Sequence, residues 1–138
     1  MTLEEARRRV GLARIARLAT LRPDGSPHLV PFCFALQGDR LVSAVDQKPK
    51  RTELLQRLAN VRRDPRAAVL VDEYDERWEQ LWWVRLDGVA AILPPGVDSE
   101  AARALLAAKY EQYRARPPLG EVLSLTIRRW SSWEARPG

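Results

Sequence analysis

The chain has 138 residues, of which 46% are hydrophobic and 30% are charged, with a formal net charge of +5. This composition is typical of one globular domain, here residues 1–138, and excludes a disordered segment. No apolar stretch reaches the roughly 20 residues that cross a bilayer, and no signal-peptide pattern opens the sequence, so we expect a cytoplasmic protein with no membrane partner. One cysteine and one histidine exclude an internal disulfide and indicate no metal-binding cluster.

The first half of the sequence predicts a helix followed by three antiparallel strands. Thr2, with Glu5 three residues later, is typical of a helix start. The turn signals are Pro-Asp-Gly at residues 23–25 and Gly-Asp at residues 38–39. We therefore expect a helix over residues 3–12 and strands over residues 14–21, 28–36 and 40–45.

The second half adds two helices and three strands. Leucines recur at helical spacing after Pro49, and Pro65 ends that segment. We expect helices over residues 50–60 and 98–113, and strands over residues 67–71, 81–93 and 122–134. Six strands with three helices indicate a mainly β (α+β) fold, a closed or nearly closed antiparallel barrel. The strand over residues 28–36 is apolar on both faces, and a subunit interface is one way to cover it.

Basic residues concentrate between positions 46 and 66, where seven lysines and arginines accompany three acids. Such a cluster indicates an anionic partner, which could be a phosphate, a nucleic acid or solvent alone. The start of the helix expected over residues 50–60 adds free backbone N–H groups, which suit a phosphate or an acidic ligand. No aromatic residue lies between positions 48 and 66, so we do not expect a nucleic-acid partner.

Three segments resemble a known superfamily. Residues 16–28 (ARLATLRPDGSPH) resemble the opening hairpin of the pyridoxamine 5′-phosphate oxidase-like FMN-binding split barrels. Residues 60–69 (NVRRDPRAAV) resemble the segment before their fourth strand, and residues 48–52 (KPKRT) lie where relatives place cofactor-phosphate residues. The helix over residues 50–60 and the block from Tyr74 to Arg85 are similar to the probable coenzyme F420-dependent oxidoreductases of this superfamily. The resemblance implies a six-stranded antiparallel split β-barrel with peripheral helices that forms a homodimer.

The same resemblance implies a cofactor at the dimer interface, either coenzyme F420 or, alternatively, FMN. Asn60 could instead end the helix, and Arg63 could simply be solvated. Adjacent strand residues point to opposite faces, so one of Trp82 and Trp83 packs in the barrel while the other lies near the cofactor ring or in the dimer interface. The implied cofactor-binding residues are Lys48, Lys50, Arg51, Thr52, Asn60, Arg63, Trp78, Trp82 and Trp83.

The implied activity is hydride transfer between reduced deazaflavin and an unidentified small-molecule acceptor, with the cofactor supplying the chemistry. No catalytic residue stands out, since the sole histidine, His28, accompanies no nucleophile and carboxylate arrangement. The arginine and histidine pair of true pyridoxamine phosphate oxidases is missing, so we do not expect vitamin B6 oxidation. The alternatives are an FMN-binding oxidoreductase or flavin reductase, and a carrier that binds the cofactor without turnover.

Overall fold

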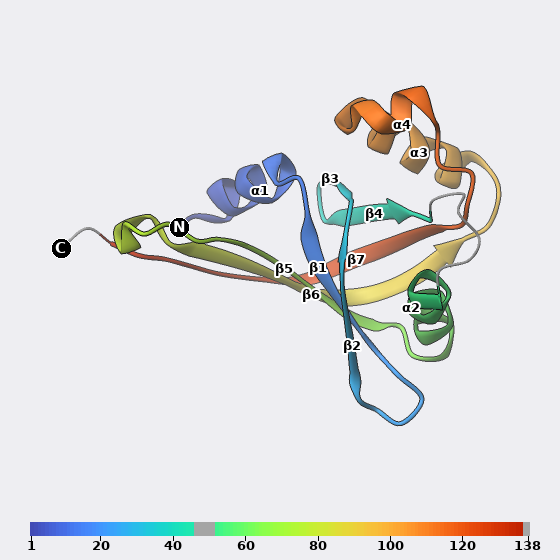
Figure 1. Ribbon diagram of the computed structural model, residues 1–138, viewed down its shortest axis with the longest axis horizontal. Helices are drawn as coiled ribbons and strands as arrows, with labels where there is room; N and C mark the ends of the chain where they lie inside the picture. Colours follow the sequence, from blue (N-terminus) through green and yellow to red (C-terminus); the bar gives the residue numbers. More distant parts are fainter. Residues whose placement is uncertain (46–51, 137–138) are drawn as a thin grey trace.

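The computed structural model describes residues 1–45 and 52–136, with side chains from residue 56 onward in the second range. The described residues form one seven-stranded antiparallel sheet in the order β2-β1-β5-β6-β7-β4-β3. Because β2 and β3 are its two edges, the sheet is an open half-barrel (Figure 1). The strands are β1 (Ala16–Leu21), β2 (Pro27–Phe32), β3 (Ala35–Gln37), β4 (Arg40–Ala44), β5 (Arg66–Glu73), β6 (Trp82–Leu93) and β7 (Val122–Glu134).

The prediction of six strands is wrong by one, because the segment expected as a single strand over residues 28–36 forms two. β2 ends at Phe32 and β3 begins at Ala35. Between them, the hydroxyl of Tyr110 accepts the backbone N–H of Phe34 at 3.1 Å and lies 3.1 Å from its carbonyl oxygen. A residue whose backbone groups both bond to a side chain leaves the sheet pairing, so the strand is interrupted at Phe34.

Four helices and a 3-10 helix accompany the sheet in the described chain. Thr2 caps α1 as predicted, since its Oγ1 accepts the N–H of Glu5 at 3.1 Å. The helix expected over residues 98–113 is two helices, because Tyr110 between them has an extended backbone with φ −112° and ψ 120°. No helix in the described ranges has the length and apolar character that a bilayer crossing requires. The helices are α1 (Leu3–Leu12), α2 (Thr52–Arg63), α3 (Val97–Lys109), α4 (Glu111–Ala115) and the 3-10 helix η1 (Trp78–Gln80).

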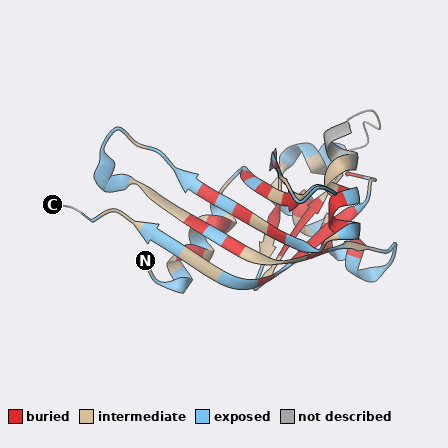
Figure 2. Cartoon of the chain, turned by 90° about the horizontal axis from the view of Figure 1, so that it is seen from below, coloured by how far each residue is buried: buried red, intermediate tan, exposed pale blue. Residues whose placement is uncertain are grey.

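The hydrophobic core lies on one face of the sheet, under α1. Burial alternates along the strands, so red and pale segments follow one another in Figure 2. Each fully buried leucine contributes about 2 kcal/mol relative to an exposed one. Ala6 and Val10 of α1 belong to the same cluster and attach the helix to the sheet. The fully buried leucines of this cluster are Leu18, Leu41, Leu86 and Leu125.

The ends of β5, β6 and β7 extend beyond the rest of the sheet (Figure 1). We call this extension, residues 72–83 and 131–136, the arm. η1 lies at its tip, and the aromatic residues Tyr74 and Trp78 on it are 65% and 68% exposed. α2 lies at the opposite end of the molecule (Figure 1). The arm therefore presents aromatic side chains far from α2.

Lys109, the last residue of α3, carries its amine into apolar surroundings. Its Nζ lies 3.8 Å from the centre of the Phe34 ring and 5.2 Å from that of Tyr110, without a hydrogen-bond partner among the described residues. Burial, helped by the neighbouring charge of Arg14, lowers the pKa of Lys109 from 10.5 to about 8. The folded chain therefore binds this proton less tightly than the unfolded chain does.

We expect Lys109→Met to raise the free energy of unfolding at pH 7 by about 1 kcal/mol, after allowance for solvent screening and for the lost ring contacts. The pKa of Lys109 is lower in the folded chain than in the unfolded chain. The loss of folding stability caused by the protonated amine therefore has its full value below about pH 8. It fades between pH 8 and 10.5 as the folded chain alone loses the proton. Urea unfolding of both proteins at pH 7 and pH 10 measures this. An equal gain at both pH values would show that the amine is not the cause.

Candidate functional site

The face of the sheet that points away from the core, which we call the outer face, carries exposed leucines at its centre with arginines on either side of Leu70. Strand pairing aligns Pro31, Arg17, Leu70 and Arg85 in one row across β2, β1, β5 and β6. Leu29, in the next row, is 65% exposed, and Leu70 is 37% exposed. Exposed apolar side chains on one face are a candidate contact surface.

A cavity of about 400 Å³ opens on the outer face where the arm begins. Trp83 and Trp133 are paired across β6 and β7, and the rest of the apolar and aromatic lining is Leu70, Tyr74, Leu81 and Trp82. The guanidinium of Arg85 lies 5.6 Å from the centre of the Trp83 ring, within cation–π range. The volume is typical of small-molecule sites, and flat aromatic walls suit a planar molecule.

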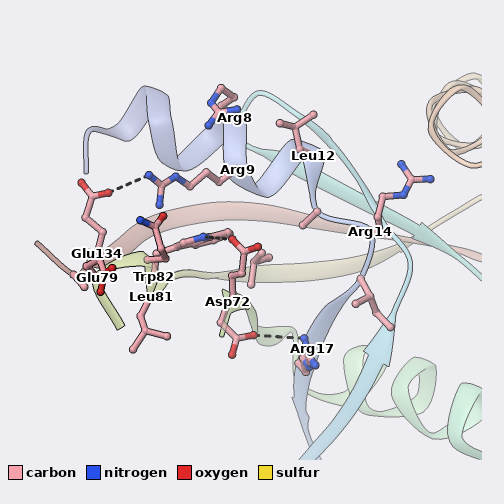
Figure 3. A pocket seen from close by; sticks show the side chains of 16 residues that line it. Arg8, Arg9, Leu12, Arg14, Arg17, Asp72, Glu79, Leu81, Trp82 and Glu134 are labelled. Atoms are coloured by element: carbon pink, nitrogen blue, oxygen red, sulfur yellow. Dashed lines mark hydrogen bonds and ion pairs between the residues drawn. The ribbon is translucent and has the colours of Figure 1, made fainter. Parts of the chain in front are cut away.

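A second cavity, of about 550 Å³, lies between α1 and the arm (Figure 3). Trp82 lines both cavities. Its Nε1 donates to Glu73 at 2.7 Å, and the guanidinium of Arg9 lies 5.2 Å from the centre of its ring. Arg9 in turn donates to Glu134 at 3.0 Å, so α1, β5, β6 and β7 all hold this indole in one orientation.

The charges around the α1 cavity are largely paired with one another. Arg8 and Arg9 both bond to Glu5, and these hydrogen bonds lower the pKa of its carboxyl to about 2. Arg17 and Asp72 face each other across the lower rim at 3.5 Å (Figure 3). Four arginines and four acids line the cavity, so it is electrically balanced and shows no preference for an anion.

At the opposite end, Asn60 and Arg63 have structural partners. Asn60 is fully buried, and its amide lies 3.1 Å from the hydroxyl of Thr20 and 2.8 Å from the amide nitrogen of Gln56. The Arg63 guanidinium donates to the carbonyl oxygen of Leu21. Both contacts attach α2 to the end of β1. Lys48, Lys50 and Arg51 lie outside the described residues, and Thr52 is the first residue of α2.

The structure thus divides the predicted cofactor residues into two groups. Trp78, Trp82 and Trp83 belong to the arm, whereas Asn60 and Arg63 belong to the α2 end (Figure 1). The two groups are too far apart to contact one compact ligand within a single chain. No group of three metal-ligating side chains occurs in the described part of the chain.

The predicted site residues did not include Trp133 and Tyr74, which line the aromatic cavity together with Trp83. The signal for Trp133 was a tryptophan beside two serines in the last strand, where an apolar core residue is not expected. Its pairing with Trp83 depends on the register of β6 against β7, and spacing along the chain does not reveal that register.

The comparison with protein families gives one match. The sequence profile described as pyridoxamine 5′-phosphate oxidase matches residues 2–134, which is nearly the whole chain.

Solved structures share the fold. A conserved hypothetical protein of Mycobacterium tuberculosis is 24% identical with a TM-score of 0.79, and the match covers 97% of this chain and 85% of that one. An FAD-binding protein of Mesorhizobium loti is 20% identical with a TM-score of 0.73, covering 96% and 94%. A heme binding protein of Mycobacterium smegmatis is 24% identical with a TM-score of 0.73, covering 95% and 57%. At these identities the likeness establishes the fold alone.

Proposed function

Because the chain belongs to the pyridoxamine 5′-phosphate oxidase family, we propose that it is an oxidoreductase that binds a flavin-type cofactor between two copies of itself. The cofactor we propose is coenzyme F420, and the reaction is hydride transfer between the reduced deazaflavin and an unidentified small-molecule acceptor. The resemblance of the block from Tyr74 to Arg85 to F420-dependent oxidoreductases supports this choice. FMN is the alternative, since its phosphate would suit the same lysines.

The observation that carries the proposal is the separation of the two groups of predicted cofactor residues. Within one chain, the arm tryptophans and the α2 end lie at opposite ends (Figure 1). A second copy related by a two-fold axis across the strands would bring the arm of one chain to the α2 end of the other. The exposed Leu29 and Leu70 of the outer face provide an apolar surface for that pairing.

When bound, a reduced deazaflavin would supply the hydride, so the protein itself needs only to bind the cofactor, orient it and shield it from water. In this proposal, Lys50 and its neighbours hold the anionic tail with fixed positive charge. Trp83 and Trp133 provide flat apolar walls that exclude water from the reacting face. Trp82, which also lines this cavity, is itself held by Glu73 and Arg9.

A non-catalytic carrier is the second candidate, and it is favoured because the two carboxylates that line the aromatic cavity, Asp72 and Glu73, are already engaged with Arg17 and with the indole N–H of Trp82. Steady-state reduction of a panel of acceptors distinguishes the two, because a carrier binds the cofactor without turnover. Since proteins of the same fold are described as FAD-binding and heme binding, both groups belong in the binding panel.

We expect ligand-stripped protein to bind F420 at micromolar or lower concentration and more tightly than FMN, FAD or haem. Quenching of tryptophan fluorescence and the emission of F420 itself measure the affinity. Lys50→Ala should weaken F420 binding about tenfold or more, as loss of a charge-assisted contact to an anion does. Arg116→Ala, an exposed arginine beyond α4, is the matched control and should bind normally. Tighter binding of FMN would assign the protein to the flavin branch, and no binding of any cofactor would refute the proposal.

A further inference from the structure

The amine of Lys109 is a buried titratable group that the proposed function does not use. The side chain as a whole is half-buried, but its Nζ is covered and has no hydrogen-bond or ion-pair partner among the described residues. The ring of Phe34 lies 3.8 Å from this nitrogen and the ring of Tyr110 lies 5.2 Å from it. A buried polar atom without a partner lowers stability, so a change that gives this nitrogen a paired group would be favourable.

A second cation is fixed beside this amine. The guanidinium of Arg14 donates to the backbone carbonyl oxygen of Lys109 at 3.0 Å, and it lies 4.7 Å from the centre of the Tyr110 ring. Two positive charges therefore share one aromatic ring at the end of α3. A negative group on the Lys109 nitrogen would convert this repulsion into an ion pair, and a guanidinium is well suited to bind a carboxylate through two hydrogen bonds.

The surroundings also keep part of the amine neutral, and the neutral form is the nucleophile. Burial and the charge of Arg14 lower the pKa of Lys109 to about 8, while Cys33 acts in the opposite direction. At pH 7.5 roughly a quarter of such amines are neutral, against about one in a thousand for a lysine in water. The two rings limit the space around Nζ and make it apolar, so the electrophile has to be small and uncharged. Carbon dioxide meets both conditions.

We propose that Lys109 is a site of reversible carbamate formation with carbon dioxide, and that Arg14 is the counter-ion of the carbamate. The neutral Nζ attacks the carbon of carbon dioxide, an N–C bond forms, and one C–O double bond becomes the single bond of a carboxylate. The proton lost from nitrogen goes to water, and nothing is oxidised or reduced. Arg14 is exposed, so the carboxylate is held at the surface rather than in the core. Lys109 lines neither of the two cavities, so the inference is independent of cofactor binding.

Carbon-13 magnetic resonance in labelled bicarbonate, which equilibrates with carbon dioxide, tests the proposal at pH 7.5. The original chain should give a carbamate signal that Lys109→Arg lacks, because a guanidinium keeps the charge without reacting. Ethylation of the carbamate by triethyloxonium, followed by peptide mass spectrometry, identifies the modified residue. The chain has three lysines, so Lys48 and Lys50 are comparison amines in the same sample and the comparison needs no variant. Lys109 should be trapped about tenfold more often than either, because more of its amine is neutral.

A change at Arg14 tests the counter-ion. Arg14→Gln should lower the carbamylated fraction about threefold or more, because it removes both the charge that helps to keep the amine neutral and the partner of the carboxylate. Arg116→Gln, at an exposed arginine beyond α4, is the matched control and should leave the fraction unchanged. Equal trapping at the three lysines, or a carbamate signal that survives Lys109→Arg in full, would overturn the site. An undiminished signal in Arg14→Gln would overturn the assignment of the counter-ion.

Discussion

Replacement of Gly88 by alanine is expected to lower the free energy of unfolding by about 3 kcal/mol, the upper end of the usual cost of overpacking. Gly88 lies on β6 beside a register shift against β7 that separates it from Asp87. A Cβ at this position would lie 2.0 Å from the carbonyl oxygen of Thr126 and 3.2 Å from the Cα of Ile127. Both neighbours are backbone, so no side-chain rotation relieves the clash, and the two strands have to separate.

The measurement is urea unfolding followed by far-UV circular dichroism. Gly11→Ala is the matched control, since a Cβ at Gly11 in α1 meets nothing within 4 Å. There alanine should stabilise the protein by about 0.5 kcal/mol, because glycine is a poor helix former. If Gly88→Ala unfolds at the same urea concentration as the original chain, the close approach of β6 to β7 at this point is wrong.

Local sequence signals predicted the elements whose causes are local. Thr2 and Glu5 identified the start of α1 because a helix cap depends on residues three apart. The Pro-Asp-Gly turn identified the β1–β2 hairpin because turn chemistry depends on consecutive residues. The strand segments were predicted from apolar runs bounded by turn signals, and in the structure β2 and β5 alternate between buried and more exposed residues.

The division of one expected strand into β2 and β3 and of one expected helix into α3 and α4 has one distant cause. Tyr110 bonds to the backbone of Phe34 and thereby interrupts a strand, and its own extended backbone separates α3 from α4. The two residues are 76 positions apart, so no window of local sequence contains the contact. Propensity alone favours a continuous strand and a continuous helix, and tertiary contact overrides it in both places.

The candidate site was predictable in part for the same reason. The family resemblance implied Trp82 and Trp83 as cofactor residues, and both line the aromatic cavity, while Trp82 alone of the two also lines the cavity beside α1. Their neighbours Tyr74 and Trp133 were not predicted, because the pairing of three strands determines which residues line the aromatic cavity, and spacing along the chain does not reveal that pairing. The separation of the arm from the α2 end could not be predicted either, because residues 60 and 78 are close to each other along the chain.

Replacement of Leu70 by arginine is expected to convert the protein to a monomer, with the dimer dissociation constant raised about a hundredfold or more. Leu70 lies at the centre of the outer face, between Arg17 and Arg85 in the paired row, and lines the aromatic cavity. In the isolated chain its partial exposure leaves the new guanidinium in water, so the fold should tolerate it. In the proposed dimer the same group would lose its water beside Arg17 and Arg85, and the nearby carboxylates of Asp72 and Asp87 are already paired with those two arginines.

Sedimentation velocity measures the change, and Leu119→Arg is the matched control, because Leu119 is an exposed leucine outside the outer face. Circular dichroism should show that both variants keep the fold.

The F420 titration then decides where the cofactor binds. A monomeric Leu70→Arg protein that no longer binds F420 supports a site built from two copies, since one chain cannot bring its arm to its own α2 end. A monomer that binds F420 as tightly as the original chain places the whole site within one copy. A Leu70→Arg protein that still dimerises would remove the outer face from the interface, and with it the argument that the arm reaches the partner.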